Sequence, residues 1–524
     1  DIGRNAGVAD ASTRQLTRRK WVVAPMSLLV IAVIGYPLAL IAIGIWRSRV
    51  IKSHEDFMVA GRNVPVSMLI GTLVCTWIGS GSLFGGAGLA YRTGLAELWF
   101  SSGAWIGLLV AFYLAPRVRS IAKYTVPDLL EQRYNATARV LGTVAIILAY
   151  VTIAAYQFRG GGWILSIVTE GAISPTQGIL ITALAIVVFT ALAGMVSIVT
   201  VDLFNGIIIT LGIVIALPYL VLSNGGVNAI ADALPEGHLT ALGGHNVLWV
   251  VGVAMPTFLL ILGESGMYQK FFSAKDAGSA KKAVVGMFIG IVFIETTLAL
   301  LAIVGRAVFP ELADPNQVSL VGRAASETII LHIAANGLPM LGGAILLAAA
   351  VAIVLSTGNT FLLVPSTNVS RDIFERFVNS DASDKQKLNV QRVFIVLFGG
   401  LGLVLLTQFD SVLAMALYAY SLVGASLTPA LLAAFIWKRV TPQGGVACIA
   451  GGLGSIIGIA ALSRMGVGFT ATISGTEFDF ASSDYIVIPG VLISLGLLVL
   501  VSLLTAPSPE DKWAPFFVEN PEEI

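Results

Sequence analysis

Long apolar runs recur along the whole chain and constrain its fold more than any other feature. A helix needs about 20 apolar residues to cross the hydrocarbon core of a bilayer. Because lipid offers the backbone no hydrogen bonds, such runs are predicted to be helices. We expect an all-α polytopic membrane protein with about thirteen transmembrane helices. The predicted spans are 21–46, 66–90, 94–115, 137–170, 175–197, 200–223, 246–271, 281–308, 338–370, 390–408, 411–437, 443–463 and 484–505.

The composition supports this class and gives no sign of an enzyme. Charged residues make up 12% of the chain, whereas soluble domains carry about 25%. Cys75 and Cys448 lie in separate apolar runs, and the four histidines lack zinc-ligand spacing. We find no G-x-x-x-x-G-K-S/T phosphate-binding loop and no pairing of a nucleophile with a base. We therefore expect no catalysis, no nucleic-acid partner and no obligate protein partner, but a lipid bilayer and a small-molecule substrate.

Basic residues in the loops predict the orientation. They gather on the side that carries the loops after the first, third, seventh, ninth and eleventh spans, including Lys270 and Lys275 around the seventh. Cytoplasmic loops carry the excess of Lys and Arg. We therefore expect a bacterial inner-membrane type of protein with its N-terminus outside and its C-terminus in the cytoplasm. The 21–46 run exceeds the apolar core of a signal peptide, about 7–15 residues, and is predicted to be a retained span.

The stretch 71–90 is apolar yet rich in glycine. Its glycines are Gly79, Gly81, Gly85, Gly86 and Gly88. Glycine inside a helix costs about 1 kcal/mol relative to alanine. Unwound backbone is tolerated at membrane depth only where it is buried in protein or lines a cavity. The stretch therefore predicts a discontinuous helix that forms a site; the alternative is a helix-packing face of the G-x-x-x-G type.

A second interruption is predicted five spans later. There Gly263 and Gly266 bracket the polar pair Glu264-Ser265. Paired interruptions at corresponding places in two halves are typical of a transporter built from inverted repeats. We expect one repeat over 66–223 and the other over 246–437. The remaining parts are an extracytoplasmic tail over 1–20, an extra helix over 21–46, two peripheral helices over 443–505 and a cytoplasmic tail over 506–524.

Ionisable residues inside the predicted spans are candidate functional residues because each is costly in lipid. They are Arg159, Asp202, Glu264 and Glu295. Each of these residues also has a purely structural interpretation. Arg159 and Glu264 fit a structural ion pair, and Glu295 fits packing beside the neighbouring threonines. Asp202 fits stabilisation of a helix start by its charge. Glu97 fits a solvated helix start as well as a ligand.

One face of the ninth predicted span is lined with polar side chains. Ser356, Asn359 and Thr360 are spaced i, i+3 and i+4, and Thr357 is adjacent. Hydroxyl and carbonyl oxygens suit a small hard cation. The alternative for each hydroxyl is a hydrogen bond to a carbonyl of its own helix.

Seven short motifs follow one another in order between about residues 25 and 465. They are Phe57-Met-Val-Ala-Gly-Arg62, Thr125-Val-Pro-Asp-Leu-Leu-Glu-Gln-Arg-Tyr134, Val201-Asp202, Tyr268-Gln-Lys270, Gly305-Arg-Ala-Val-Phe-Pro310, Ser356-Thr357 with Arg371-Asp-Ile373, and Trp437-Lys-Arg-Val-Thr-Pro-Gln-Gly-Gly445. Together they resemble the sodium/solute symporter family of proline, pantothenate, glucose and choline carriers. The segment 157–162 is similar to pantothenate-type members and 76–81 to choline-type members, so the substrate stays unassigned.

The resemblance implies a LeuT-like fold of five plus five helices that works by alternating access. It also implies a sodium site between the first broken helix and the eighth core helix. Its ligands would be the backbone carbonyls of Cys75, Ile78 and Ile353 and the hydroxyls of Ser356 and Thr357. A second sodium in some members would use Asp202, Asn359 and Thr360, although the last two replace the serines expected there.

Substrate contacts in the family come from both broken helices and from the third and tenth core helices. By resemblance the positions are Trp77, Ser82, Tyr156, Arg159, Glu264, Tyr268 and Tyr418. Arg159 with Glu264 suits a carboxylate or a zwitterion held by charge-assisted hydrogen bonds.

We therefore expect a symporter that uses sodium ions to import a small polar organic solute, such as an organic acid, an amino acid or a vitamin-like compound. One alternative is the same fold driven by protons through Asp202 or Glu264. A membrane sensor that kept the fold is the other alternative, and it is disfavoured because no cytoplasmic output domain follows the spans.

Overall fold

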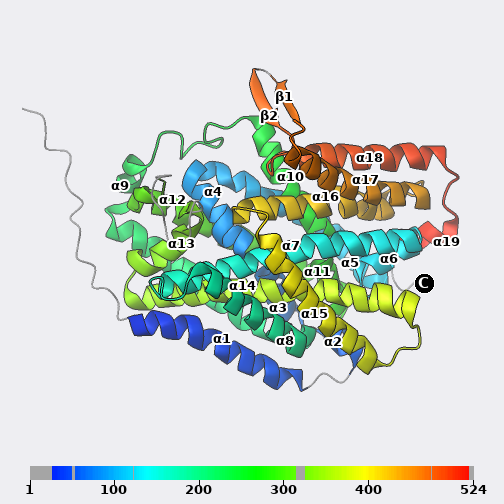
Figure 1. Cartoon of the computed structure of the whole chain (residues 1–524), viewed down its shortest axis with the longest axis horizontal. Coiled ribbons are helices and arrows are strands. Elements are labelled where there is room, and N and C mark those ends of the chain that lie inside the picture. The colour runs from blue at the N-terminus through cyan, green and yellow to red at the C-terminus, as the bar shows by residue number, and fades with distance from the viewer. Residues whose placement is uncertain (1–25, 50–52, 122, 314–324, 474, 518–524) are drawn as a thin grey trace, which may run out of the picture.

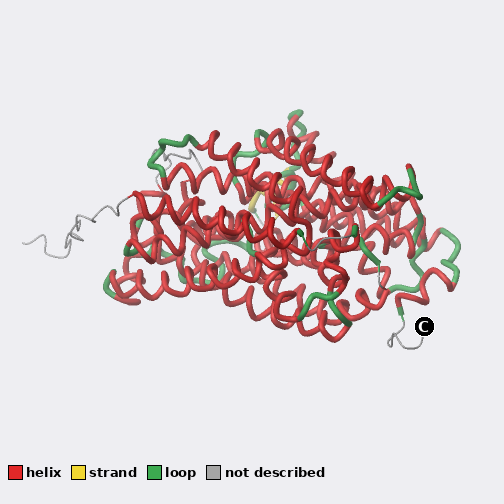
Figure 2. Tube along the Cα trace, turned by 90° about the horizontal axis from the view of Figure 1, so that it is seen from below, coloured by secondary structure: helices red, strands yellow, loops and turns green. Residues whose placement is uncertain are grey.

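The computed structural model describes residues 26–49, 53–121, 123–313, 325–473 and 475–517. The predicted tail over 1–20, the start of the 21–46 span and the end of the 506–524 tail lie outside these residues. The long helices form one bundle and run side by side (Figure 2). Eleven described helices are long and apolar enough to cross a membrane.

The long helices account for most of the bundle. They are α1 (Met26–Ser48), α5 (Leu98–Ile121), α7 (Ala136–Val168), α8 (Pro175–Ser223), α10 (Val247–Gly263), α12 (Ala277–Val308), α14 (Met340–Asn368), α15 (Asp384–Leu406), α16 (Val412–Ile436), α17 (Pro442–Arg464) and α18 (Val487–Leu504). Polar caps fix where several of them begin. Asn135 and Asn246 each accept a backbone hydrogen bond at the start of α7 and α10, and Ser383 forms a capping box on α15.

Shorter elements connect or interrupt the long helices. The short helices are α2 (His54–Val59), α3 (Val66–Trp77), α4 (Ala87–Thr93), α6 (Val126–Arg133), α9 (Gly226–Ala233), α11 (Ser265–Ser273), α13 (Ile329–His332) and α19 (Glu510–Trp513). Strands β1 (Thr470–Ile473) and β2 (Thr476–Asp479) form an antiparallel hairpin that projects from the bundle (Figure 1).

The predicted spans 175–197 and 200–223 meet inside α8 without a loop. Gly194 divides them, with a non-helical backbone at φ 59° and ψ −178°. A side chain there would also meet the Phe57 ring, which would lie 2.6 Å from the added carbon. The positive φ and the close ring both require glycine.

The centre of the bundle is formed by α3, α8, α12 and α14. Helices α3 and α8 pack against each other and against both α12 and α14, and α7 packs against α14. Helix α14 is buried along most of its length. Helix α1 lies along one edge and α17 with α18 along the opposite edge (Figure 1). Polar side chains on α14 are therefore enclosed by protein, which is where a membrane helix tolerates them.

Candidate functional site

The first interruption lies between α3 and α4. Helix α3 ends at Trp77, Ile78 is extended at φ −73° and ψ 94°, and winding resumes as a π-type turn over Gly81–Gly86. Glycine is needed here because side chains of α14 and α16 lie close to the backbone of the break. A methyl group on Gly79 would lie 2.9 Å from the Thr357 methyl carbon, and one on Gly81 would lie 2.5 Å from the Tyr420 hydroxyl. The break is thus packed directly against α14 and α16.

The second interruption lies between α10 and α11. Glu264 is extended there, at φ −71° and ψ 101°. Its carboxylate accepts hydrogen bonds from the backbone N–H of Gly266 (2.9 Å) and of Met267, and from the Tyr150 hydroxyl (2.7 Å). Tyr268 donates back across the break to the Leu262 carbonyl (2.8 Å). Glu264 therefore caps the half-helix α11, a favourable place for a carboxylate.

Helix α14 brings hydroxyls to the carbonyls that the first break frees. The Thr357 hydroxyl lies 3.2 Å from both the Cys75 and the Ile78 carbonyl oxygens. The Ser356 hydroxyl lies 3.5 Å from the Cys75 carbonyl oxygen. Ile353 is one turn earlier on the same buried helix. Four of the five predicted sodium ligands therefore converge at one point, and all of them are oxygens.

Asp202 on α8 lies beside these hydroxyls. Its carboxylate accepts hydrogen bonds from Ser356 (2.5 Å) and Thr72 (2.6 Å). The Lys270 ammonium, on α11, donates to the Thr72 carbonyl (2.9 Å) and to the Thr76 hydroxyl. Thr72 thus holds the carboxylate with its side chain and the ammonium with its backbone, and the two charges attract each other.

Lys270 corrects one expectation from the loop charges. Its side chain is 0% exposed, so it does not belong to the basic loop in which we counted it. Helix α11 continues past the second break to Ser273 and turns Lys270 toward α3 instead of toward solvent.

The other two residues of the predicted second sodium site point in different directions. The Thr360 hydroxyl lies 3.3 Å from the Thr76 hydroxyl, which also accepts a hydrogen bond from the Lys270 ammonium. Asn359 accepts a hydrogen bond from Thr190 on α8 (3.1 Å). Thr360 is therefore linked to Asp202 only through the chain of Thr76, Lys270 and Thr72, whereas Asn359 is engaged elsewhere.

The predicted substrate residues fall into separate groups. Trp77 and Ser82 both donate to Glu295. The hydroxyls of Tyr156 and Tyr420 lie 3.3 Å apart, next to the first break.

Two other predicted contacts lie apart from these groups. Arg159 donates to the carbonyls at the end of α15, those of Leu406 and Phe409 (both 2.7 Å), and no described ion pair joins it to Glu264. Tyr418 donates to Ala481 beyond the hairpin (2.7 Å).

Two polar residues near the first break, Gln157 and Trp105, were not singled out from the sequence. Gln157 on α7 accepts hydrogen bonds from the Ser80 backbone N–H (2.9 Å) and hydroxyl (2.6 Å). Trp105 donates to Glu295 (2.7 Å). Glu97 is 3% exposed, so the idea of a solvated helix start is wrong. The sequence signal of Gln157 and Trp105 is weak, because only the packing of distant helices brings these two side chains to the break.

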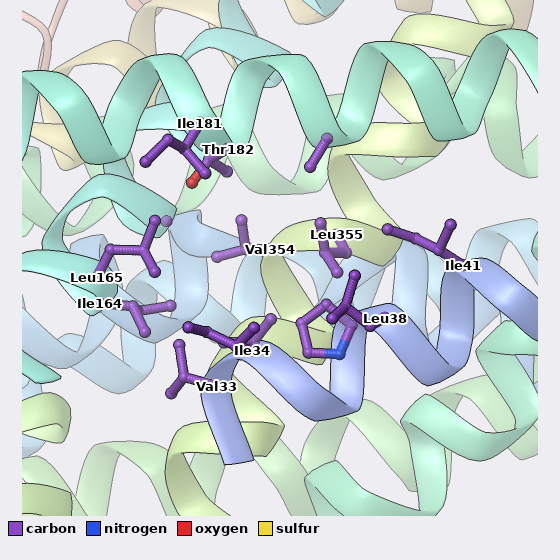
Figure 3. Close-up of a pocket in the computed structure, with 14 residues that line it drawn as sticks. Val33, Ile34, Leu38, Ile41, Ile164, Leu165, Ile181, Thr182, Val354 and Leu355 are labelled. Atoms are coloured by element: carbon purple, nitrogen blue, oxygen red, sulfur yellow. The ribbon is translucent and has the colours of Figure 1, made fainter. Parts of the chain in front are cut away.

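A separate cavity of about 170 Å³ lies between α1 and the bundle. Figure 3 shows Val33 and Leu38 of α1 facing Ile164, Val354 and Leu355. Its side chains are apolar except for Thr182. A polar solute finds only one polar side chain there, so we place the candidate site at the breaks.

Solved structures of sodium- or cation-coupled transporters have the same fold. A sodium-coupled sialic acid symporter in its substrate-bound, outward-open state superposes with a TM-score of 0.72, at 17% identity, over 92% of this chain and 99% of its own. Mhp1, a nucleobase-cation-symport-1 family transporter closed on bromovinylhydantoin, gives a TM-score of 0.53, at 13% identity, over 89% and 97%. Two broken helices at the centre of this fold define a LeuT-like secondary transporter.

The sequence profile of the sodium:solute symporter family matches residues 57–452, and the chain belongs to this family. Its curated relatives include the osmoregulated proline transporter OpuE of Bacillus subtilis, 24% identical over 92% of this chain and 96% of its own. The sodium/proline symporter of Staphylococcus aureus is 23% identical over 90% and 91%. The chain is a multi-pass membrane protein whose activity is sodium-coupled solute import, and its family and fold are those of transporters.

Proposed function

We propose that one sodium ion binds between the first break and α14 and drives the import of a small zwitterionic solute. The observation that carries this proposal is the position of Thr357, 3.2 Å from the carbonyl oxygens of both Cys75 and Ile78. Carbonyl and hydroxyl oxygens replace the water around a hard cation. Because Cys75 contributes its carbonyl, its thiol is not required as a ligand.

Only one sodium is proposed because Lys270 supplies the second positive charge. Its ammonium is fixed by Thr72 and Thr76, and Thr72 also holds Asp202. A buried carboxylate paired in this way already has its counter-charge. A second ion at Asp202 would be repelled by Lys270.

The solute site is proposed beside the first break, around Trp77, Ser82 and Tyr156, with Glu264 and Tyr268 shaping the second break. Arg159 and Tyr418 are left out because their polar groups bond elsewhere. A zwitterionic amino acid of the proline type is the first solute to test, since the relatives named above are proline transporters.

The mechanism we propose is alternating access. Sodium first binds between α14 and the first break and completes the solute site. Solute then binds, and the two repeats rock against each other. We place the end with α2 and α6 in the cytoplasm of a bacterial inner membrane. One charge that moves inward through 100 mV then contributes about 2.3 kcal/mol, or roughly 50-fold accumulation.

Uptake into proteoliposomes tests this function. We expect labelled L-proline to enter when sodium is outside, and to enter faster with an inside-negative potential. Replacing sodium by choline or potassium should abolish uptake. Uptake that ignores sodium and collapses with a protonophore would contradict sodium coupling and favour the proton-driven alternative.

A further inference from the structure

Two buried carboxylates meet at a recess beside the first break. The recess is lined by Glu97, Glu295, Ser82 and Ser101, with Gly86 and small apolar side chains around them. These residues come from four helical elements: the π-type turn Gly81–Gly86, the 3₁₀ turn Gly94–Glu97, α5 and α12. The recess has no room for a water molecule in this conformation, so neither carboxylate is solvated there.

The carboxylate of Glu295 is tied to both sides of the break. One oxygen accepts hydrogen bonds from Trp77 (2.9 Å), the last residue before the break, and from Ser82 (3.3 Å), just after it. The other oxygen accepts from Trp105 on α5 (2.7 Å). These neutral donors position Glu295 and leave its negative charge without a counter-charge.

The carboxylate of Glu97 accepts fewer hydrogen bonds than that of Glu295. Its Oε1 accepts a hydrogen bond from Ser101 (2.9 Å), but its Oε2 is buried and has no hydrogen-bond partner among the described residues. The side chain lies against Gly86, where an added carbon would be 3.2 Å from Oε1. Glu97 and Glu295 repel each other, and neither forms an ion pair with a described Lys or Arg.

A positively charged group would stabilise these two buried carboxylates. A buried carboxylate is costly unless it is paired, and two together more so. Aromatic rings adjoin the recess: Phe100 stacks on Tyr420 with ring centroids 6.4 Å apart, and Phe100 also lies beside Gly86. Acidic oxygens next to aromatic faces are the surroundings that favour an organic ammonium group.

We propose that Glu97 and Glu295 bind the positively charged nitrogen of the transported solute. The proposal rests on the solute-import function above and names its substrate class: compounds with a protonated or quaternary amine, not simple organic acids or neutral solutes. Because the recess is closed here, the nitrogen enters it when the repeats move apart during alternating access. Solute binding then neutralises the acid pair and ties the first break to α5 and α12.

Matched compounds that differ only at the nitrogen test the proposal. Thermal unfolding of the purified protein is followed with L-proline against tetrahydrofuran-2-carboxylate, glycine betaine against 3,3-dimethylbutanoate, and L-alanine against L-lactate, each with and without sodium. We expect sodium-dependent stabilisation from at least one nitrogen-bearing member and from none of its partners. Stabilisation reports affinity because ligand binds only the folded state.

Variants of single acidic residues test whether the amine binds at the recess. Glu97→Gln and Glu295→Gln keep the shape of the side chain and remove its charge, and each should weaken binding of the active amine at least tenfold. Glu327→Gln is the matched control: Glu327 is a buried acid that caps α16 outside the recess, and the variant should keep wild-type amine affinity. Stabilisation by sodium alone, retained in all three variants, verifies that they fold.

Other outcomes would overturn the proposal. They are binding of the nitrogen-free partners as tightly as the amines, unchanged amine affinity in both recess variants, or no amine binding while sodium still stabilises the protein. In these cases the proposed sodium site stands, and only the assignment of the solute fails. If sodium alone gives no stabilisation, the proposed function itself fails.

Discussion

Thr72 links two opposite charges at the scale of single residues. Its hydroxyl donates to Asp202 (2.6 Å) while its carbonyl accepts from the Lys270 ammonium (2.9 Å). All three side chains are buried. Removing one partner of a buried charge pair costs about 3–5 kcal/mol because it leaves the other uncompensated. The pair is therefore a structural element of the site as well as a part of its electrostatics.

A double-mutant cycle tests this coupling. Lys270→Met and Asp202→Asn should each lower the thermal unfolding midpoint in detergent strongly, and the double variant should lose much less than the sum of the two. Strictly additive losses would mean that the two charges do not interact, and would contradict the proposal that Lys270 replaces a second sodium ion.

At the scale of helices, the first break depends on glycine where α14 approaches. A methyl group on Gly79 would lie 2.9 Å from the Thr357 methyl carbon and 3.0 Å from Gln157 Nε2. Gly79→Ala should push α14 away from the break and raise the sodium concentration for half-maximal stabilisation at least tenfold. Gly454→Ala on α17 is the control, since no atom lies within 4 Å of the added carbon. Equal sodium affinity in both variants would contradict the tight fit.

The helices and their interruptions could be predicted from the sequence because apolar length and glycine content are local signals. The convergence of Ser356 and Thr357 on the break came from the family resemblance. Burial of Lys270 could not be predicted, because its neighbours Lys275 and Lys281 carry the pattern of a basic loop. The meeting of Glu97 with Glu295 depends on packing between residues far apart in the chain. Arg159 looked like a ligand, but its long side chain reaches the carbonyls that end α15.

At the scale of the whole molecule, an ion-pair cluster joins several helices at the end that carries α6. Arg139 on α7 contacts Asp128 (2.6 Å), Glu131 (2.5 Å) and Asp372 (2.6 Å). Burial raises the pKa of the Glu131 carboxyl, but hydrogen bonds from Arg376 and Arg139 outweigh it and lower that pKa overall. Glu131 therefore stays charged at neutral pH, and the cluster joins α6 and α7 to the π-helical segment Val369–Val378 that continues α14.

Opening of this end can be followed through Cys75, which is buried and lies at the proposed sodium site. In a Cys448→Ser background, Arg139→Ala should speed alkylation of Cys75 severalfold, and sodium should slow it. Arg376→Ala is the control because Arg376 is half exposed and exposed ion pairs contribute little. The same labelling rate in both variants would show that the cluster does not hold this end closed.

The central claim is that sodium binds where α14 meets the first broken helix. The most direct test is a sodium titration of thermal stability for the purified wild-type protein and for Thr357→Ala, with potassium and choline as reference cations. We expect stabilisation of the wild type by sodium alone, and at least a tenfold higher sodium requirement for Thr357→Ala. Identical titrations of the two proteins, or equal stabilisation by potassium, would contradict it.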